Sequence, residues 1–191
     1  IPSENVMSPK AKGALVSDFG SRYFFYTPYK NTESTSYEYS GTEEIKDLIE
    51  YGEELSCKLF GCKFSSLYSL SGHVANLTVL FTFCKRGDRI LCTSPESGGY
   101  PGLAKEKLPR LLSLKTDFLP YSDDGDLDLV KFEYIINKHD YKLIFFSSAH
   151  TVFPEKIKEV RDIIESSKSK SLLVYDASHP LGLIAGKNFQ Q

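Results

Sequence analysis

From residue 64 onward, short apolar runs alternate with amphipathic segments. Apolar runs of four to eight residues are typical of strands buried in a sheet, and apolar residues three or four positions apart are typical of helices. The pattern predicts strands over residues 64–68, 89–93, 118–121, 142–147 and 172–175. It predicts helices over residues 74–84, 100–107 and 129–137, and a further helix marked by Ile157, Val160, Ile163 and Ile164.

The N-terminal third carries two more helical signals. Ser8 and Pro9 form a favourable cap and first turn, which predicts a helix that ends near residue 19. A second helix is predicted over residues 42–59, where apolar residues recur at helical spacing. Residues 23–40, between the two helices, are polar, aromatic and irregular, and are interpreted as an extended arm.

Strands that alternate with helices require crossover connections. We therefore predict an α/β fold, namely a three-layer α/β/α sandwich around a mostly parallel sheet. We divide the chain into an N-terminal helix and arm, residues 1–41, and a large domain, residues 42–191. Ligands in such sheets bind at the carboxyl ends of the strands. Segments that directly follow a strand are therefore the first candidates for chemistry.

One such segment, Ser69-Leu70-Ser71-Gly72-His73, stands between a predicted strand and a predicted helix. A helix start offers backbone N–H groups to an anion, Gly72 permits a close approach, and the hydroxyls and His73 add donors. An ordinary capped helix is the competing interpretation.

A second segment follows the last apolar strand, which ends at Asp176. A carboxylate there is costly to bury without a cationic partner, and a protonated pyridinium nitrogen would be such a partner. His179 could reach the same ring, while the alternative is an Asp that caps the next loop beside a surface His. Similarly, Gly98 and Gly99 either set the Tyr100 ring over a planar ligand or form a plain turn with an exposed tyrosine.

Composition excludes several classes of protein. The 191 residues are 41% hydrophobic and 25% charged, as in a globular domain with a real core. The net charge of -2 gives no electrostatic footprint for nucleic acid, and no apolar run has the length of a membrane span. The four cysteines are scattered, so neither a disulfide framework nor a metal site is expected. We predict a cytoplasmic protein.

In their order along the chain, these segments together resemble serine hydroxymethyltransferases. The matching motifs are Ser3-Glu4-Asn5-Val6-Met7-Ser8-Pro9 (family SEN..SP), Leu59-Phe60-Gly61 (LFG), Ser71-Gly72-His73-Val74-Ala75-Asn76-Leu77 (SGSQANL), Lys85-Arg86-Gly87-Asp88-Arg89-Ile90-Leu91 (KPGDTIL), Gly98-Gly99-Tyr100 (GGH) and Val174-Tyr175-Asp176-Ala177-Ser178-His179-Pro180-Leu181-Gly182-Leu183-Ile184-Ala185-Gly186 (VDMAHIAGLVAAG).

The resemblance implies fold type I, with pyridoxal phosphate bound at a homodimer interface and an amino acid as substrate. It implies that Tyr23 and His179 are catalytic residues and that Tyr23 comes from the partner subunit. The other implied roles are Asp176 paired with the pyridine nitrogen, His179 near the phenolic oxygen, Ser71, Gly72 and His73 at the phosphate, Tyr100 stacked on the ring and Ser3 near the substrate carboxylate.

The chain also departs from the family pattern. The family's catalytic glutamate, in AEGYP, aligns with Phe25, a phosphate-binding serine is replaced by His73, and a stacking histidine by Tyr100. The family's Schiff-base lysine follows the aspartate by roughly thirty residues, which lies beyond Gln191. We therefore expect a fragment, with the product of a truncated gene as the alternative, that lacks this lysine and the C-terminal small domain. We expect it to form a homodimer or to associate with its missing half.

Three functional hypotheses follow. The first is a pyridoxal-phosphate enzyme with C–C lyase or transferase chemistry, such as aldol cleavage of a β-hydroxy amino acid, without the folate-dependent reaction. The second is a degenerate, non-catalytic paralogue, which Phe25 favours and which the retention of Asp176 and His179 opposes. The third is another fold-type I activity, such as an aminotransferase, whose distinguishing arginine would lie in the small domain.

Overall fold

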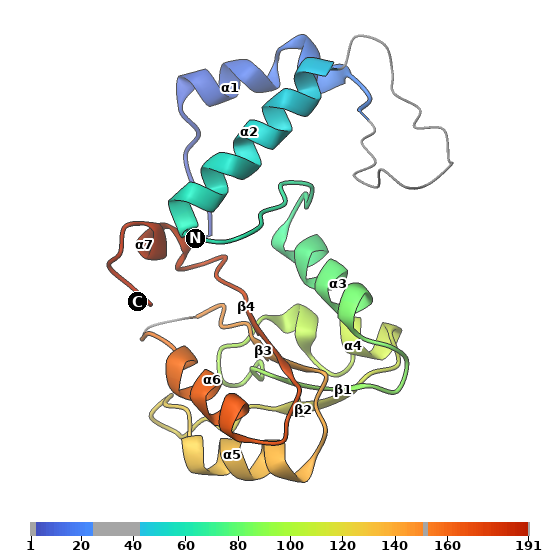
Figure 1. Ribbon diagram of the computed structural model, residues 1–191, viewed down its shortest axis with the longest axis vertical. Coiled ribbons are helices and arrows are strands. Elements are labelled where there is room, and N and C mark those ends of the chain that lie inside the picture. Colours follow the sequence, from blue (N-terminus) through green and yellow to red (C-terminus); the bar gives the residue numbers. More distant parts are fainter. Residues whose placement is uncertain (1–2, 25–42, 151–152, 191) are drawn as a thin grey trace. The chain divides into compact units, whose positions relative to one another are not determined.

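The computed structural model describes residues 3–24, 43–150 and 153–190. They fall into two compact units, one made of Ile1–Ser3 and Ser69–Gln191 and the other of Glu4–Tyr68 (Figure 1). No described helix is both long and apolar enough to cross a membrane.

The smaller unit is helical in its described parts. Its elements are α1 (Pro9–Leu15), the 3-10 helix η1 (Asp18–Ser21) and α2 (Glu43–Phe60). The predicted cap is present, because the Ser8 hydroxyl accepts a hydrogen bond from the backbone N–H of Ala11 at 3.2 Å. The first helix ends earlier than predicted, and the chain continues as the separate turn η1.

The strand predicted over residues 64–68 is wrong, because these residues form no strand. Phe64 is 80% exposed and Leu67 is 54% exposed. A short apolar run becomes a strand only when it pairs with a neighbour and buries a face, and these side chains do neither within the described part of their unit.

The larger unit confirms the predicted α/β fold. Its four strands, β1 (Arg89–Cys92), β2 (Lys115–Phe118), β3 (Leu143–Phe146) and β4 (Leu172–Tyr175), are all parallel in the order β2-β1-β3-β4. The other elements are α3 (Gly72–Phe83), η2 (Pro101–Leu103), α4 (Leu108–Leu111), α5 (Leu129–Lys138), α6 (Ile157–Ser166) and α7 (Leu181–Ala185).

The central strand β3 shows why helices cover both faces of this sheet. Leu143 and Phe145 belong to an apolar cluster with Leu80 of α3, whereas Ile144 and Phe146 belong to a second cluster with α5 and α6. All four β3 side chains are buried, as an apolar run without polar alternation predicts. Figure 1 shows α5 and α6 together on one side of the sheet.

Three element boundaries differ from the predictions. β2 ends at Phe118, where a strand was predicted to begin, and Pro120 just beyond it has no N–H to extend the ladder. Of the helix predicted over residues 100–107, only the short 3-10 helix η2 is present, and α4 begins just beyond this range; each has a proline in its first turn. Helix α7 was not predicted, because its five residues are too few to show a period.

Candidate active site

The carboxyl ends of β3 and β4 open onto a cavity of about 430 Å³, which we call the Asp176 cavity. Ser147 and Ser148 directly follow β3, and Asp176 directly follows β4. Parallel strands place such residues at one edge of the sheet. The residues of the cavity wall that the sequence had predicted are Ser3, Gly72, His73, Tyr100, Asp176 and His179.

Asp176 is held at the end of β4 by bonds to both its backbone and its carboxylate. Its N–H donates to the carbonyl oxygen of Phe146 at 2.8 Å. Its Oδ2 accepts from Asn76 Nδ2 at 2.9 Å, and its Oδ1 accepts from the backbone N–H and the hydroxyl of Ser178 at 3.0 and 2.5 Å. No cation among the described residues forms an ion pair with this half-buried carboxylate. The carboxylate is therefore oriented but not neutralised.

The hydrogen bonds of Asp176 bear on both interpretations of this residue, loop cap and partner of a ligand cation. The bonds from Ser178 are those of an Asp that caps the following loop. The bond from Asn76 is different, because it comes from the middle of α3 and crosses 100 residues of sequence. Loop capping alone does not account for this second donor.

Asn76 was missed in the sequence. It is only 5% exposed, on a helix whose other residues are mostly apolar. A buried amide side chain needs a partner, so a polar residue inside an apolar helical run was the signal available.

The predicted phosphate-binding segment is divided between two roles. Ser71 caps α3, since its hydroxyl accepts from the backbone N–H of Val74 at 3.2 Å, and it is not part of the cavity wall. Gly72 is part of the wall, and a Cβ placed there would lie 3.1 Å from the Ser178 hydroxyl oxygen. The structure brings Gly72, but not Ser71, to the cavity.

His73 and Tyr100 are joined across the Asp176 cavity wall. Nδ1 of His73 lies 2.7 Å from the Tyr100 hydroxyl oxygen, within hydrogen-bond distance. The two rings meet edge to face at 6.1 Å between their centroids. The backbone N–H of Tyr100 donates to the Ser147 carbonyl at 2.7 Å, which attaches this residue to the end of β3.

Two buried polar atoms of the wall have no hydrogen-bond partner in the described part of the chain, the hydroxyl of Ser147 and Nδ1 of His179. Leaving a buried donor or acceptor unsatisfied costs about 1–3 kcal/mol, so native proteins rarely do so without a functional reason. Both residues belong to the same wall as Asp176, so they offer hydrogen-bonding atoms to a molecule in the cavity.

A second polar network adjoins the cavity and was not predicted. Glu155 accepts from the Ser148 hydroxyl at 2.5 Å and from the Tyr121 hydroxyl at 2.9 Å. Burial, and after it the charges of Glu155 and Asp176, raise the pKa of Tyr175 to about 12. Ser148 belongs to the walls of both the Asp176 cavity and a neighbouring cavity of about 400 Å³.

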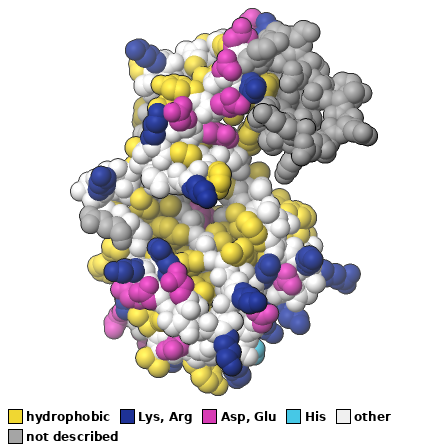
Figure 2. All heavy atoms as spheres, in the orientation of Figure 1, with side chains coloured by type: hydrophobic (Ala, Val, Ile, Leu, Met, Phe, Trp, Pro, Cys, Tyr) yellow, Lys and Arg dark blue, Asp and Glu magenta, His cyan; other side chains and the backbone are white. Residues whose placement is uncertain are grey.

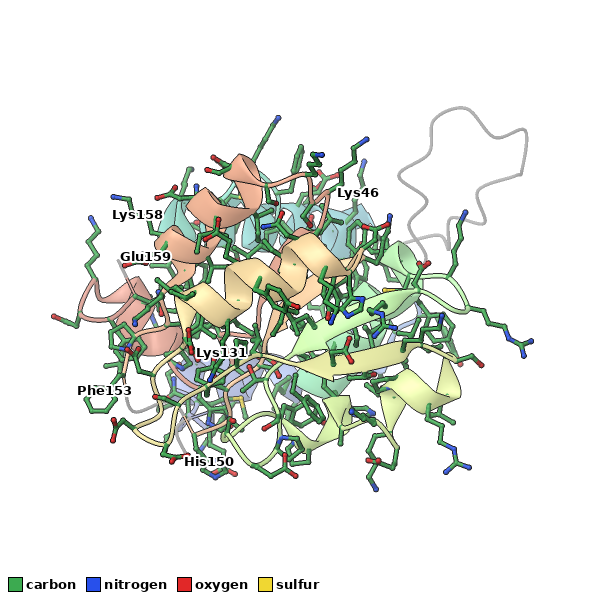
Figure 3. The ribbon with its side chains drawn as sticks, turned by 90° about the horizontal axis from the view of Figure 1, so that it is seen from below. Lys46, Lys131, His150, Phe153, Lys158 and Glu159 are labelled. Carbon is green, nitrogen blue, oxygen red and sulfur yellow. The ribbon has the colours of Figure 1, made fainter. Side chains whose placement is uncertain are left out.

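That neighbouring cavity also has His150 and Phe153 in its wall (Figure 3). Glu155 lies in the same wall and therefore connects the two cavities through Ser148.

Two predicted positions lie elsewhere. Tyr23 belongs to the smaller unit and is 82% exposed, and its catalytic role stays a prediction. Phe25, at the position of the family's glutamate, lies outside the described residues. The described residues also contain no group of three or more His, Cys, Asp or Glu side chains that could hold a metal ion.

Comparison with known proteins relates the whole chain to one family. All of it aligns with the serine hydroxymethyltransferases of Korarchaeum cryptofilum, at 33% identity over 202 residues, and of Methanobrevibacter smithii, at 31% over 194 residues. The chain is a divergent relative of the serine hydroxymethyltransferase family. It spans 45% and 44% of the length of these two relatives. No family model matches the chain.

Other relatives of this serine hydroxymethyltransferase-like chain carry different names. The alpha-methylserine aldolase of Variovorax paradoxus is 31% identical over 191 residues, and the chain spans 42% of it. The crystal structure of the L-threonine transaldolase of Pseudomonas fluorescens matches with a TM-score of 0.85 at 19% identity, over 97% of this chain and 41% of that one. The latter shows that the two share a fold.

Proposed function

We propose that this chain is part of a pyridoxal-phosphate-dependent enzyme that acts on an amino acid, with the cofactor held in the Asp176 cavity. The observation that carries the proposal is an oriented carboxylate at the carboxyl end of β4 that has no cationic partner among the described residues. A protonated pyridinium nitrogen is a cation whose charge such a carboxylate would neutralise.

The residues present fit this cofactor. Asp176 offers a negative charge for the ring nitrogen, and Tyr100 offers an aromatic face. The hydroxyl of Ser147 and Nδ1 of His179 offer hydrogen-bonding atoms that the described residues do not otherwise use. The small residue Gly72 at the start of α3 leaves room for a phosphate next to backbone N–H groups.

Each side chain then has a defined task. When bound, pyridoxal phosphate withdraws electrons from the substrate's α-carbon. Asp176 keeps the proton on the ring nitrogen, because a nearby negative charge raises the pKa of that nitrogen. Asn76 and Ser178 hold the carboxylate in a fixed orientation in the cavity wall. His73 lies within hydrogen-bond distance of the Tyr100 hydroxyl, and His179, in the same wall, would be available to a cofactor bound there.

The reaction class that fits best is the breaking or forming of a C–C bond in a hydroxy amino acid. Support comes from the relatives' names, which are a hydroxymethyltransferase, an aldolase acting on alpha-methylserine and a transaldolase acting on threonine. We infer that the active assembly is a homodimer or includes the part of the protein corresponding to the remainder of the relatives' length. A non-catalytic paralogue is the second candidate, and Phe25 in place of the family's glutamate favours it.

Turnover of β-hydroxy amino acids by the complete protein, supplied with pyridoxal phosphate, tests the proposal. Asp176→Asn should lower the rate by about a thousandfold or more, because several kcal/mol of barrier depend on the charged ring nitrogen. The matched control is Asp162→Asn, an exposed position on α6, which should leave the rate unchanged. Equal rates for the protein and Asp176→Asn, or no turnover of any such substrate, would favour the non-catalytic paralogue.

A further inference from the structure

The opposite edge of the sheet, where the strands begin, carries a separate cavity of about 780 Å³. Six basic side chains and only two carboxylates belong to its wall, although the whole chain has a net charge of -2. We call it the basic cavity. Its basic residues are Arg89, Lys115, Lys138, Lys142, Lys168 and Lys170. In Figure 2, Lys and Arg side chains gather over the lower right of the larger unit.

The sheet itself spaces four of these cations in a row. Lys115 begins β2, Arg89 begins β1 and is aligned with Lys115, and Lys142 directly precedes β3. Backbone hydrogen bonds continue the row, because Lys142 N–H donates to the Arg89 carbonyl at 2.7 Å and Leu172 N–H to the Lys142 carbonyl at 3.1 Å.

Lys170, two residues before β4, completes the row. Neighbouring strands lie about 4.8 Å apart, so the row places one basic residue at or just before the start of each strand.

The lysines of this row are available to a ligand. Lys115, Lys142 and Lys170 are exposed, and none of them forms a hydrogen bond or ion pair through its side chain with any described residue. Arg89 differs, since it forms an ion pair with Asp117 at 2.5 Å. Unpaired lysines that converge on one cavity repel each other, and a multivalent anion would remove that repulsion.

We propose that the basic cavity binds a linear oligophosphate. A single charge can satisfy one lysine of the row, whereas a chain of phosphates presents charges to several strands at once, and lysine binds phosphate as a point charge. A nucleic-acid strand fits less well, because Tyr141, the only Tyr, Phe or Trp in the wall among the described residues, is 1% exposed and offers no ring face to a base. The proposal is independent of the cofactor assignment.

Equilibrium binding of inorganic tripolyphosphate to the purified protein at low ionic strength tests this proposal. Lys142→Gln/Lys170→Gln should raise the Kd by about tenfold, since each lost charge weakens binding severalfold. The matched control, Lys131→Gln/Lys158→Gln, removes the same charge from the N-terminal halves of α5 and α6 (Figure 3). It should change the Kd less than about twofold.

Three results would overturn the proposal. They are no binding of tripolyphosphate, equal weakening by the two double variants, and tighter binding of a single-stranded oligonucleotide of matched charge than of tripolyphosphate. The substituted side chains are exposed, and urea unfolding of each variant verifies that the fold is retained.

Discussion

The two edges of the parallel sheet use polar residues in opposite ways. At the carboxyl edge, Asp176 and Glu155 each accept two or more hydrogen bonds from other residues of the described chain. At the amino edge, the lysines of the basic cavity have no such partners. Preorganised groups suit one rigid ligand in one orientation, whereas unpaired lysines suit a flexible anion whose affinity depends on salt.

If this comparison holds, a substitution at the carboxyl edge should affect folding most. Asn76→Ala removes a buried donor to Asp176 and should lower the free energy of unfolding by about 2 kcal/mol. Asn137→Ala is the control, since that amide is exposed and bonds only within its own helix, and the change should be below about 0.5 kcal/mol. Urea denaturation measures both. Equal effects would mean that the Asn76 bond is no stronger than a surface contact.

The second carboxyl-edge network should respond more weakly. Glu155→Gln leaves one acceptor oxygen for the two hydroxyl donors of Ser148 and Tyr121, so we expect a loss of about 1 kcal/mol. Glu159→Gln, on the exposed face of α6 and labelled in Figure 3, is the control and should be neutral. If the urea unfolding curves of Glu155→Gln and Glu159→Gln coincide, Glu155 does not organise this edge.

The ion pair beside the amino edge should contribute least. Burial raises the pKa of Asp117, but hydrogen bonds from Arg89 and Tyr141 outweigh it and hold the pKa below its usual value. The stabilisation should be complete above about pH 4 and should be lost as the pH falls through the lower folded pKa. It should stay under about 1 kcal/mol, because the pair is partly solvated.

Unfolding by urea at several pH values, for the protein and for Asp117→Asn, measures this contribution. Below about pH 4, the free energy of unfolding of Asp117→Asn should fall less steeply with decreasing pH than that of the unmodified protein. If the free energies of unfolding of the two proteins depend on pH in the same way, the contribution does not come from Asp117.

The sequence predicted those strands of the sheet whose burial follows from a continuous apolar run. β3 and β4 are apolar runs between polar residues, and their predicted positions agree with the structure to within two residues. The run at residues 64–68, which includes two serines, forms no strand, since a strand also needs a neighbour with which to pair. The end of β2 was misplaced for a similar reason, because Leu119 is buried and apolar yet lies outside the strand.

The residue pattern pointed to candidate-site residues that follow a strand or begin a helix, and the family resemblance added Ser3. Asp176, His179 and Gly72 met that condition and line the cavity. Asn76 did not, since its partner lies 100 residues away and the contact exists only once α3 packs on the sheet. Glu155 did not either, because its role depends on where the chain after β3 folds back.

The cofactor assignment of the Asp176 cavity is tested most directly by equilibrium dialysis of pyridoxal phosphate against the protein, Asp176→Asn and the control Asp162→Asn. We predict that the protein and Asp162→Asn bind with the same affinity, and that Asp176→Asn binds about tenfold more weakly, as the loss of one charge-assisted hydrogen bond requires. Equal affinity of Asp176→Asn and the protein, or no binding by the protein, would contradict the assignment of this cavity to the cofactor.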